Sequence, residues 1–162
     1  MSKVAVMQSY IAFASDSQNP PFPKRQNDPG EEHTSVLVGK SVVIVEDEGV
    51  TQMQLRRMLK NAGLKVVASA INGEQAVEAV LRERPDLVLM DIRMPGPFDG
   101  LEAARRILAE YSVCIVMLTA FSDEEYLKRA EEIKVCGYIL KPVTTESLIP
   151  KIEAALRNFG PH

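Results

Sequence analysis

The chain has 162 residues, of which 46% are apolar and 25% charged, and its formal net charge is -3. This length suits one domain with a single core and a short tail. No apolar run approaches the ~20 residues of a membrane span, and a negative charge without a Lys/Arg-rich stripe argues against a nucleic-acid binder that works by charge.

The first 38 residues differ in composition from the rest of the chain. Prolines and turn-forming residues gather between positions 19 and 30 without an apolar period. This pattern predicts a flexible extension over residues 1–38 and a folded domain over residues 39–160. The stretch 4–14 superficially resembles a secretory signal, but polar residues interrupt it. We therefore interpret the segment as a disordered arm and expect a cytoplasmic protein.

From Gly39 onward, short runs rich in β-branched residues alternate with segments that carry apolar residues three and four positions apart. Such runs predict buried strands, and such spacings predict helices. In chain order the elements are a strand at 41–45, a helix at 50–62, a strand at 64–70, a helix at 74–83, a strand at 86–90, a helix at 101–110, a strand at 113–118, a helix at 122–133, a strand at 137–140 and a helix at 145–159.

Local signals support these boundaries. Gly63 closes the first helix, and Pro85 ends the second. A capping box at 122–125 begins the fourth helix, and Pro150 can make the first turns of the last helix irregular. Five strands that alternate with five helices predict a doubly wound, three-layer α/β domain. It is a flavodoxin-like (βα)5 sandwich whose parallel sheet has the order 2-1-3-4-5.

Polar side chains gather where the predicted strands end. Glu46 and Asp47 follow the first strand, Asp91 follows the third, and Thr119 and Lys141 follow the fourth and fifth. Right-handed crossovers place the carboxyl ends of parallel strands at one edge of the sheet, where ligands bind. With the first and third strands as neighbours, the three carboxylates converge on one pocket beside Thr119 and Lys141.

Two carboxylates 4 Å apart repel each other by about 4 kcal/mol at an effective dielectric of 20, so we expect a cation in this pocket. Mg²⁺ suits it best because it takes oxygen ligands and keeps exchangeable waters, and Mn²⁺ is an alternative. Thr119 and Lys141 suit the oxygens of a transferring phosphoryl group. Asp91 is the predicted nucleophile, which forms an aspartyl phosphate, and Glu46 and Asp47 are predicted metal ligands. A single acid after a strand is commonly a helix cap, but five groups at four strand ends are hard to obtain by chance.

Four segments carry a family resemblance: VIVEDE at 43–48, LVLMD at 87–91, LTA at 118–120 and GYILKP at 137–142. With them, the chain resembles the receiver domain of two-component response regulators, in a single-domain form similar to the chemotaxis regulators. The resemblance implies a regulatory domain rather than an enzyme. It implies that Asp91 accepts phosphate from a phosphohistidine on a sensor histidine kinase or a histidine phosphotransfer protein.

The resemblance also assigns roles to further residues. The backbone carbonyl of Arg93 joins the three carboxylates as a ligand of Mg²⁺. Thr119 and Tyr138 form a switch that remodels the face built by the fourth helix, the fifth strand and the fifth helix, where a downstream protein binds. Neither nucleic acid nor a membrane is expected as a partner, and a homodimer stays open.

The sequence departs from the family pattern in two places. The loop 94–100 is one residue longer than the commonest version, and it resembles a subgroup that is often attached to sensor kinases or stands alone. Arg93 and Phe121 lie two positions after Asp91 and Thr119, beside the path of a hydrolytic water, and both are bulky. We hypothesise that they slow the loss of phosphate because they exclude water.

Three alternatives stay open from the sequence. Only a few residues follow the last predicted helix, so we expect either a stand-alone receiver or a receiver fragment of a larger hybrid kinase or regulator. An aspartyl-phosphate phosphatase is disfavoured, because such enzymes place a second Asp where this chain has Arg93. A pseudo-receiver that only binds is disfavoured by the complete site.

The two cysteines are too few and too far apart for a disulfide framework or a zinc cluster. Cys114 and Cys136 lie at or just before the amino-terminal ends of the fourth and fifth strands, away from the acidic edge. The sequence favours buried, inert thiols over a redox switch.

Overall fold

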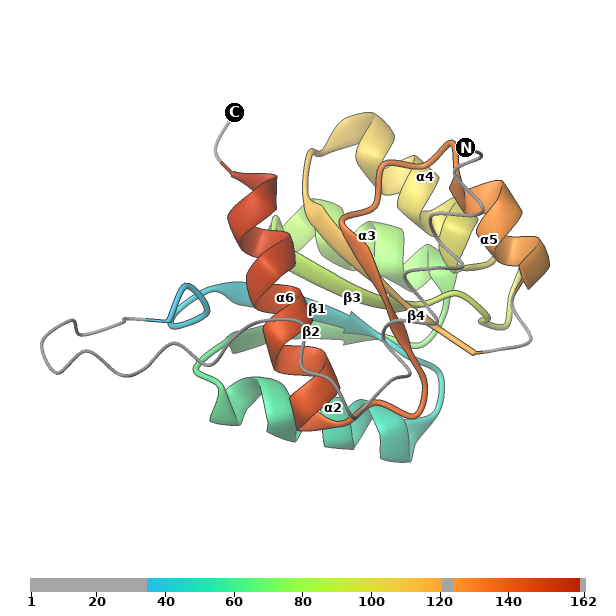
Figure 1. Ribbon diagram of the computed structural model, residues 1–162. Helices are drawn as coiled ribbons and strands as arrows, with labels where there is room; N and C mark the ends of the chain where they lie inside the picture. The colour runs from blue at the N-terminus through green and yellow to red at the C-terminus, as the bar shows by residue number, and fades with distance from the viewer. Residues whose placement is uncertain (1–34, 121–123, 161–162) are drawn as a thin grey trace, which may run out of the picture.

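The computed structural model describes residues 35–120 and 124–160, which form a three-layer α/β domain (Figure 1). Its parallel sheet has the order β2-β1-β3-β4-β5. The strands are β1 (Ser41–Val45), β2 (Lys65–Ala70), β3 (Leu87–Asp91), β4 (Cys114–Thr119) and β5 (Gly137–Leu140). The helices are α2 (Gly49–Asn61), α3 (Gly73–Glu83), α4 (Gly100–Glu110), α5 (Glu124–Ala130) and α6 (Thr145–Phe159). The predicted fold class and strand order are confirmed.

Helices cover both faces of the sheet (Figure 1). The first core cluster lies between the sheet and helices α3, α4 and α5, and it includes Val80, Ile107 and Leu127. The second core cluster lies between the sheet and helices α2 and α6, and it includes Leu59 and Ile152. Every residue of β3 and β4 is buried. This two-sided burial explains why the central strands are continuous apolar runs in the sequence.

The fourth helix is shorter than its sequence pattern predicts. The predicted helix covers 122–133, whereas α5 ends at Ala130, and the predicted capping box falls on residues that the structure describes only in part. After Ala130 the chain turns, and the amide of Ile133 donates to the Ala130 carbonyl at 3.0 Å. The turn brings Cys136 to β4, where its amide donates to the Ile115 carbonyl at 2.7 Å. Pairing with the sheet therefore overrides the local helical pattern.

Two side chains of the helices differ from a simple interpretation of the pattern. Helix α6 continues through Pro150, and a capping box between Thr144 and Ser147 secures its first turn. Met53 shares the apolar spacing of α2, yet its side chain is 59% exposed. The buried face of α2 consists of Leu55 and Leu59, so Met53 contributes to the surface rather than to the core.

Residues 35–38, which the composition groups with the extension, pack on the domain. Leu37 is fully buried in the second core cluster. The Ser35 hydroxyl donates to Glu153 Oε1 on α6 at 2.9 Å, and the Gly39 amide donates to the Gly63 carbonyl at 2.9 Å. The packed domain therefore includes residues 35–38.

Gly100 fixes how closely α4 approaches the end of β3. A Cβ atom at this position would lie 2.1 Å from the Asp91 carbonyl oxygen and 3.1 Å from the Ile92 Cα. The Gly100 amide donates to the Ile92 carbonyl at 2.8 Å, and the Asp99 side chain caps α4 at the Glu102 amide. A side chain larger than hydrogen cannot enter without moving backbone that carries Asp91.

We predict that Gly100→Ala destabilises the domain by about 1–3 kcal/mol, the usual cost of overpacking. Gly49→Ala is the matched control, because a Cβ on this first residue of α2 meets nothing within 4 Å. Urea unfolding followed by circular dichroism measures both variants. Equal stability of the Gly100→Ala variant and the wild type would contradict this prediction, because it would show that the backbone at Asp91 moves aside without a cost in free energy.

Candidate functional site

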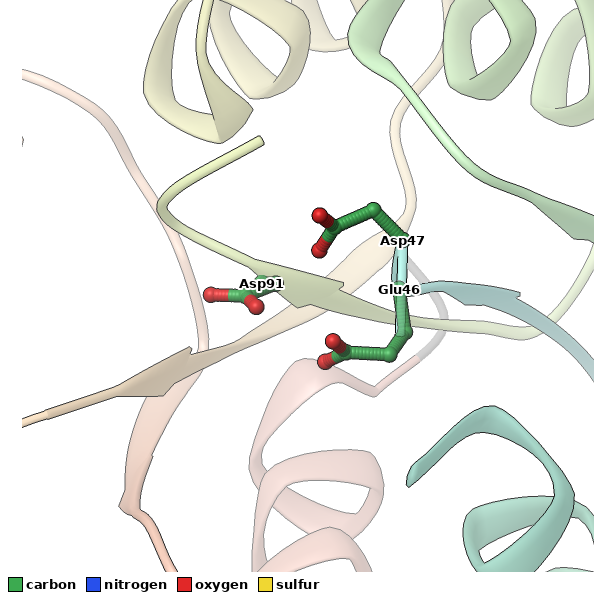
Figure 2. A group of neighbouring side chains, drawn as sticks. All are labelled: Glu46, Asp47 and Asp91. Carbon is green, nitrogen blue, oxygen red and sulfur yellow. The ribbon is translucent and has the colours of Figure 1, made fainter. Parts of the chain in front are cut away.

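The acidic side chains meet at the carboxyl edge of the sheet, as the topology predicts. Glu46 and Asp47 follow β1, and Asp91 is the last residue of the adjacent strand β3. Figure 2 shows the three carboxylates gathered at the end of β3, with Glu46 and Asp47 extending from neighbouring backbone positions. One ligand oxygen from each residue lies within 4.8 Å of the others. The structure therefore brings the three predicted acids together.

The three acids differ in their contact with solvent. Glu46 is 1% exposed and Asp91 is 6% exposed, whereas Asp47 is exposed. A buried carboxylate loses its hydration, and this loss costs free energy unless other groups stabilise its charge. The site therefore holds two poorly hydrated charges beside one that solvent can screen.

Lys141 connects the two buried acids. Its Nζ donates to Asp91 Oδ2 at 2.6 Å and to Glu46 Oε2 at 3.1 Å. Burial lowers the pKa of Lys141, but the hydrogen bonds and charges of Asp91 and Glu46 outweigh burial and raise it overall. Lys141 is therefore a fixed positive charge against the carboxylate that the sequence predicts to react.

Glu46 titrates unusually for a carboxyl group. Burial and the charge of Asp91 raise its pKa to about 7, although the hydrogen bond and charge of Lys141 act in the opposite direction. Its Oε1 also accepts a bond from the Glu48 amide at 3.3 Å. One ammonium does not balance three acids, so the remaining negative charge calls for a proton or a cation.

Arg93 and Gln52 contact the acidic residues through different groups. The Arg93 amide donates to Asp91 Oδ1 at 3.2 Å, and the Arg93 guanidinium lies 5.2 Å from the centroid of the Tyr126 ring on α5. Gln52 Nε2 donates to the Glu46 carbonyl at 3.0 Å. Sequence reasoning missed Gln52, although its place on the first turn of α2 after the acidic pair could have indicated it.

Thr119 ends β4 at the acidic edge of the sheet, whereas Tyr138 lies two residues before the end of β5. Thr119 is 1% exposed, and its hydroxyl donates to the adjacent Ala120 carbonyl at 3.2 Å. Tyr138 packs on the first core cluster, and burial raises its pKa to about 12. The remaining candidate, Phe121, lies outside the described residues.

Backbone hydrogen bonds tie these side chains to one another. The Ile92 amide donates to the Leu118 carbonyl at 3.1 Å, and the Lys141 amide donates to the Thr119 carbonyl at 2.7 Å. The residues after β3, β4 and β5 are thus held in register beyond the ends of the strands. Short backbone contacts therefore connect the end of β3 to β4 and the end of β4 to the residue after β5.

The described residues contain no helix that is long and apolar enough to cross a membrane.

A sequence profile for the response regulator receiver domain matches residues 42–153. The chain is 40% identical over 122 residues to the transcriptional regulatory protein PdtaR of Mycobacterium tuberculosis, covering 75% of this chain and 59% of that protein. It is 34% identical over 128 residues to the phosphate regulon transcriptional regulatory protein PhoB of Pseudomonas aeruginosa, covering 77% and 55%. The chain thus spans less than two thirds of the length of these curated relatives.

Solved structures agree with these sequence matches. The signal receiver domain of a modulated diguanylate cyclase from Desulfovibrio desulfuricans G20 superimposes with a TM-score of 0.70 and 36% identity, covering 75% of this chain and 96% of that one. The N-terminal domain of a response regulator/sensory box/GGDEF 3-domain protein from Carboxydothermus hydrogenoformans gives a TM-score of 0.68 and 33% identity, covering 74% and 96%. The chain therefore belongs to the response regulator receiver domains of two-component signalling.

Proposed function

We propose that this chain is a phosphorylatable receiver of a two-component phosphorelay, in which Asp91 accepts a phosphoryl group from a phosphohistidine. One observation carries the proposal: Lys141 contacts the buried carboxylates of Asp91 and Glu46, 2.6 and 3.1 Å away, next to the exposed acid Asp47. Receiver domains as a family are regulatory and act with histidine kinases or histidine phosphotransfer proteins. The proposed donor is intracellular, so we also propose a cytoplasmic location.

The donor set fits a hard divalent cation, because carboxylate oxygens from three residues lie within 4.8 Å of one another. We assign Glu46, Asp47, Asp91 and the backbone carbonyl of Arg93 as ligands of Mg²⁺, with Mn²⁺ as an alternative. When bound, the ion supplies positive charge that offsets the acids and the incoming phosphoryl oxygens.

The chain's own groups position the reaction. A carboxylate oxygen of Asp91 forms a bond to phosphorus while the P–N bond of phosphohistidine breaks, and the bonding electrons return to the imidazole nitrogen. Lys141 already touches Asp91, so its ammonium lies next to the phosphoryl oxygens once they arrive. The hydroxyl of Thr119 reaches the same oxygens by turning away from the Ala120 carbonyl.

We propose that phosphorylation is transmitted through Thr119 and Tyr138. The new phosphoryl charge offers contacts that favour one of two arrangements of the domain. Tyr138 lies on β5, which contacts α6, and it packs on the first core cluster, to which α5 contributes Leu127 and Ala130. Its movement therefore reshapes the face made by α5, β5 and α6. A downstream protein docks on this face in the proposed function, and a homodimer through it is an alternative.

A groove next to the acids suits the approach of the phosphodonor protein. It has a volume of about 410 Å³ and is lined by residues of α2 and of the segment after β5, among them Met58, Lys141 and Val143. Val50 and Met53 on α2 are 58% and 59% exposed. Apolar side chains beside a reactive carboxylate favour protein contact at this surface.

The same residues bear on two alternatives, a receiver fragment of a larger protein and an aspartyl-phosphate phosphatase. A receiver fragment of a larger hybrid kinase or regulator uses the site in the same way. Because residues 35–38 pack on the domain, we propose that the domain begins at Ser35, rather than at the limit of 39 that composition predicts, and extends to 160. An aspartyl-phosphate phosphatase needs a general acid two positions after Asp91, where this chain has Arg93. The guanidinium of Arg93 cannot serve as that acid, because it stays protonated.

We predict that acetyl phosphate with Mg²⁺ adds one phosphoryl group, about 80 Da, to the wild type and none to Asp91→Asn. Intact mass spectrometry measures both proteins, and chelation with EDTA abolishes the labelling. Asp99→Asn is the matched control. Asp99 lies in the loop that follows Asp91, and asparagine keeps the cap of α4. Labelling of Asp91→Asn, or many turnovers on p-nitrophenyl phosphate by the wild type, contradicts the proposed function.

We predict that Glu46→Gln weakens Mg²⁺ binding at pH 8 by about tenfold or more, or ~1.4 kcal/mol, because a charged ligand is lost. Titration of Mg²⁺ measured by calorimetry tests this. Glu48→Gln is the control, since the Glu48 side chain is exposed and outside the cluster. Equal affinities of the Glu46→Gln variant and the wild type would remove Glu46 from the metal site.

Without metal, we predict that the difference in folding stability between the Glu46→Gln variant and the wild type depends on pH. The pKa of Glu46 is about 7 in the folded chain against an ordinary 4.5. Protonation therefore favours the folded state, and this contribution is lost as pH rises from about 4.5 through about 7. In EDTA the variant should gain stability relative to wild type between pH 5 and pH 8 in urea unfolding. A constant difference across this range contradicts the burial of a charged Glu46.

We predict that replacing both Arg93 and Phe121 with alanine shortens the lifetime of the phosphorylated protein several-fold, because water gains access to the aspartyl phosphate. The loss of label after removal of the donor measures the rate. Arg93 has a second contact with Tyr126, so Tyr126→Leu serves as a control for loosening α5. An unchanged lifetime in the double variant defeats the hypothesis.

A further inference from the structure

The two cysteines of the chain meet at the edge of the sheet opposite to the acids. Cys114 is the first residue of β4, whereas Thr119 is its last. Cys136 immediately precedes β5 and is held to β4 by the 2.7 Å bond from its amide to the Ile115 carbonyl. Cys114 belongs to the second core cluster, and Cys136 packs against that cluster. Residues far apart in the chain thus present two thiols to the same side of the sheet.

Strand geometry places the two backbones at a separation that a disulfide can span. Val116 pairs with Gly137 in the parallel register, so Ile115 lies beside Cys136 and Cys114 lies one residue further. A strand spacing of about 4.8 Å and a rise of about 3.3 Å per residue give a Cα–Cα separation of about 6 Å. Disulfides span about 4.4–6.8 Å. Neither cysteine is in a disulfide in this structure, and each thiol shifts the pKa of the other.

The two thiols differ in accessibility and acidity. Cys114 is 0% exposed, whereas Cys136 is half-buried. The hydrogen bond from Cys114 and a backbone bond from Ile115 lower the pKa of Cys136 to about 7, against the effect of burial. The bond to Cys136 and burial raise the pKa of Cys114. Cys136 is therefore the more acidic and more accessible of the two thiols, and Cys114 is buried behind it.

We propose that Cys114 and Cys136 form an oxidisable dithiol, in which Cys136 reacts first with hydrogen peroxide and Cys114 then closes an intramolecular disulfide. In the first step a bond forms between the Cys136 sulfur and a peroxide oxygen, the O–O bond breaks, and water leaves after protonation. In the second step the Cys114 sulfur attacks the sulfenic acid, the S–S bond forms, the S–O bond breaks, and the Cys114 proton leaves with hydroxide as a second water. The sulfurs lose two electrons in total, and one hydrogen peroxide gains them.

The proposed disulfide joins the starts of two strands whose other ends reach the acidic site. It ties the segment before β5 to β4 beneath α6, whose buried residues belong to the same core cluster. No step involves Asp91 or a metal ion, so the inference stands apart from the proposed phosphoryl transfer. Cys136, the residue that reacts first in this proposal, directly precedes β5, the strand that carries Tyr138. Lys141 follows the other end of the same strand.

The test treats the reduced full chain with hydrogen peroxide, blocks free thiols with iodoacetamide under denaturing conditions, and measures intact mass. We expect both alkylations to disappear, a mass lower by about 2 Da for the two lost hydrogens, and full reversal by dithiothreitol. Non-reducing electrophoresis should show a monomer. Because the chain has only two cysteines, these readouts identify the bond without further mapping.

Matched variants separate the order of the two steps. Cys114→Ala should stop at a sulfenic acid that dimedone traps, whereas Cys136→Ala should react at least about tenfold more slowly, because its remaining thiol is buried and protonated. Two alkylatable thiols in peroxide-treated wild type, a disulfide between two molecules, or equal reactivity of the two variants overturns the proposal. The wild-type measurement decides it even where a variant fails to fold.

Discussion

The main physical constraint on this structure is the burial of two carboxylates, Glu46 and Asp91, beside a single ammonium group, Lys141. Glu46 and Asp91 are almost inaccessible to water, and Lys141 bonds to both. Two carboxylates 4 Å apart repel by about 4 kcal/mol at an effective dielectric of 20, and Asp47 adds a third acid. A single lysine cannot cancel that charge, so the site takes up a proton on Glu46 or binds a cation. The raised pKa of Glu46 and the proposed Mg²⁺ site are therefore two consequences of one imbalance.

The strand order of the sheet brings these charged groups together. Only an order in which β1 adjoins β3 brings Glu46 beside Asp91, and β4 and β5 then extend the same edge with Thr119 and Lys141. Strands β1, β3 and β4 are held by buried apolar residues on both faces, which resist the repulsion. Gly100 completes the arrangement, because its missing side chain lets α4 press against the Asp91 carbonyl.

Sequence reasoning recovered most of the fold because buried parallel strands leave a plain signal. The runs at β1 and β5 were placed to the residue, and the rule that strand ends share one edge located the acids and Lys141. It did not recover features set by distant contacts. The end of α5 depends on the bond between Cys136 and β4, and the exposure of Met53 depends on which side of α2 faces the core. The orientation of the Thr119 hydroxyl and the bond of Gln52 to Glu46 depend on side-chain geometry that no spacing encodes.

β5 is the element on which both proposed chemistries act. It is four residues long, pairs with β4 alone, and is fully buried only at Ile139. Cys136 precedes it and Lys141 follows it, which places a thiol at one end and the ammonium of the acidic site at the other. A short edge strand with one partner shifts at a smaller free-energy cost than the central strands, whose two faces and two edges are all packed. In the two proposals, phosphorylation acts on its carboxyl end through Lys141, and a disulfide fixes its amino end to β4. This short edge strand is thus the element that connects the two proposed chemistries.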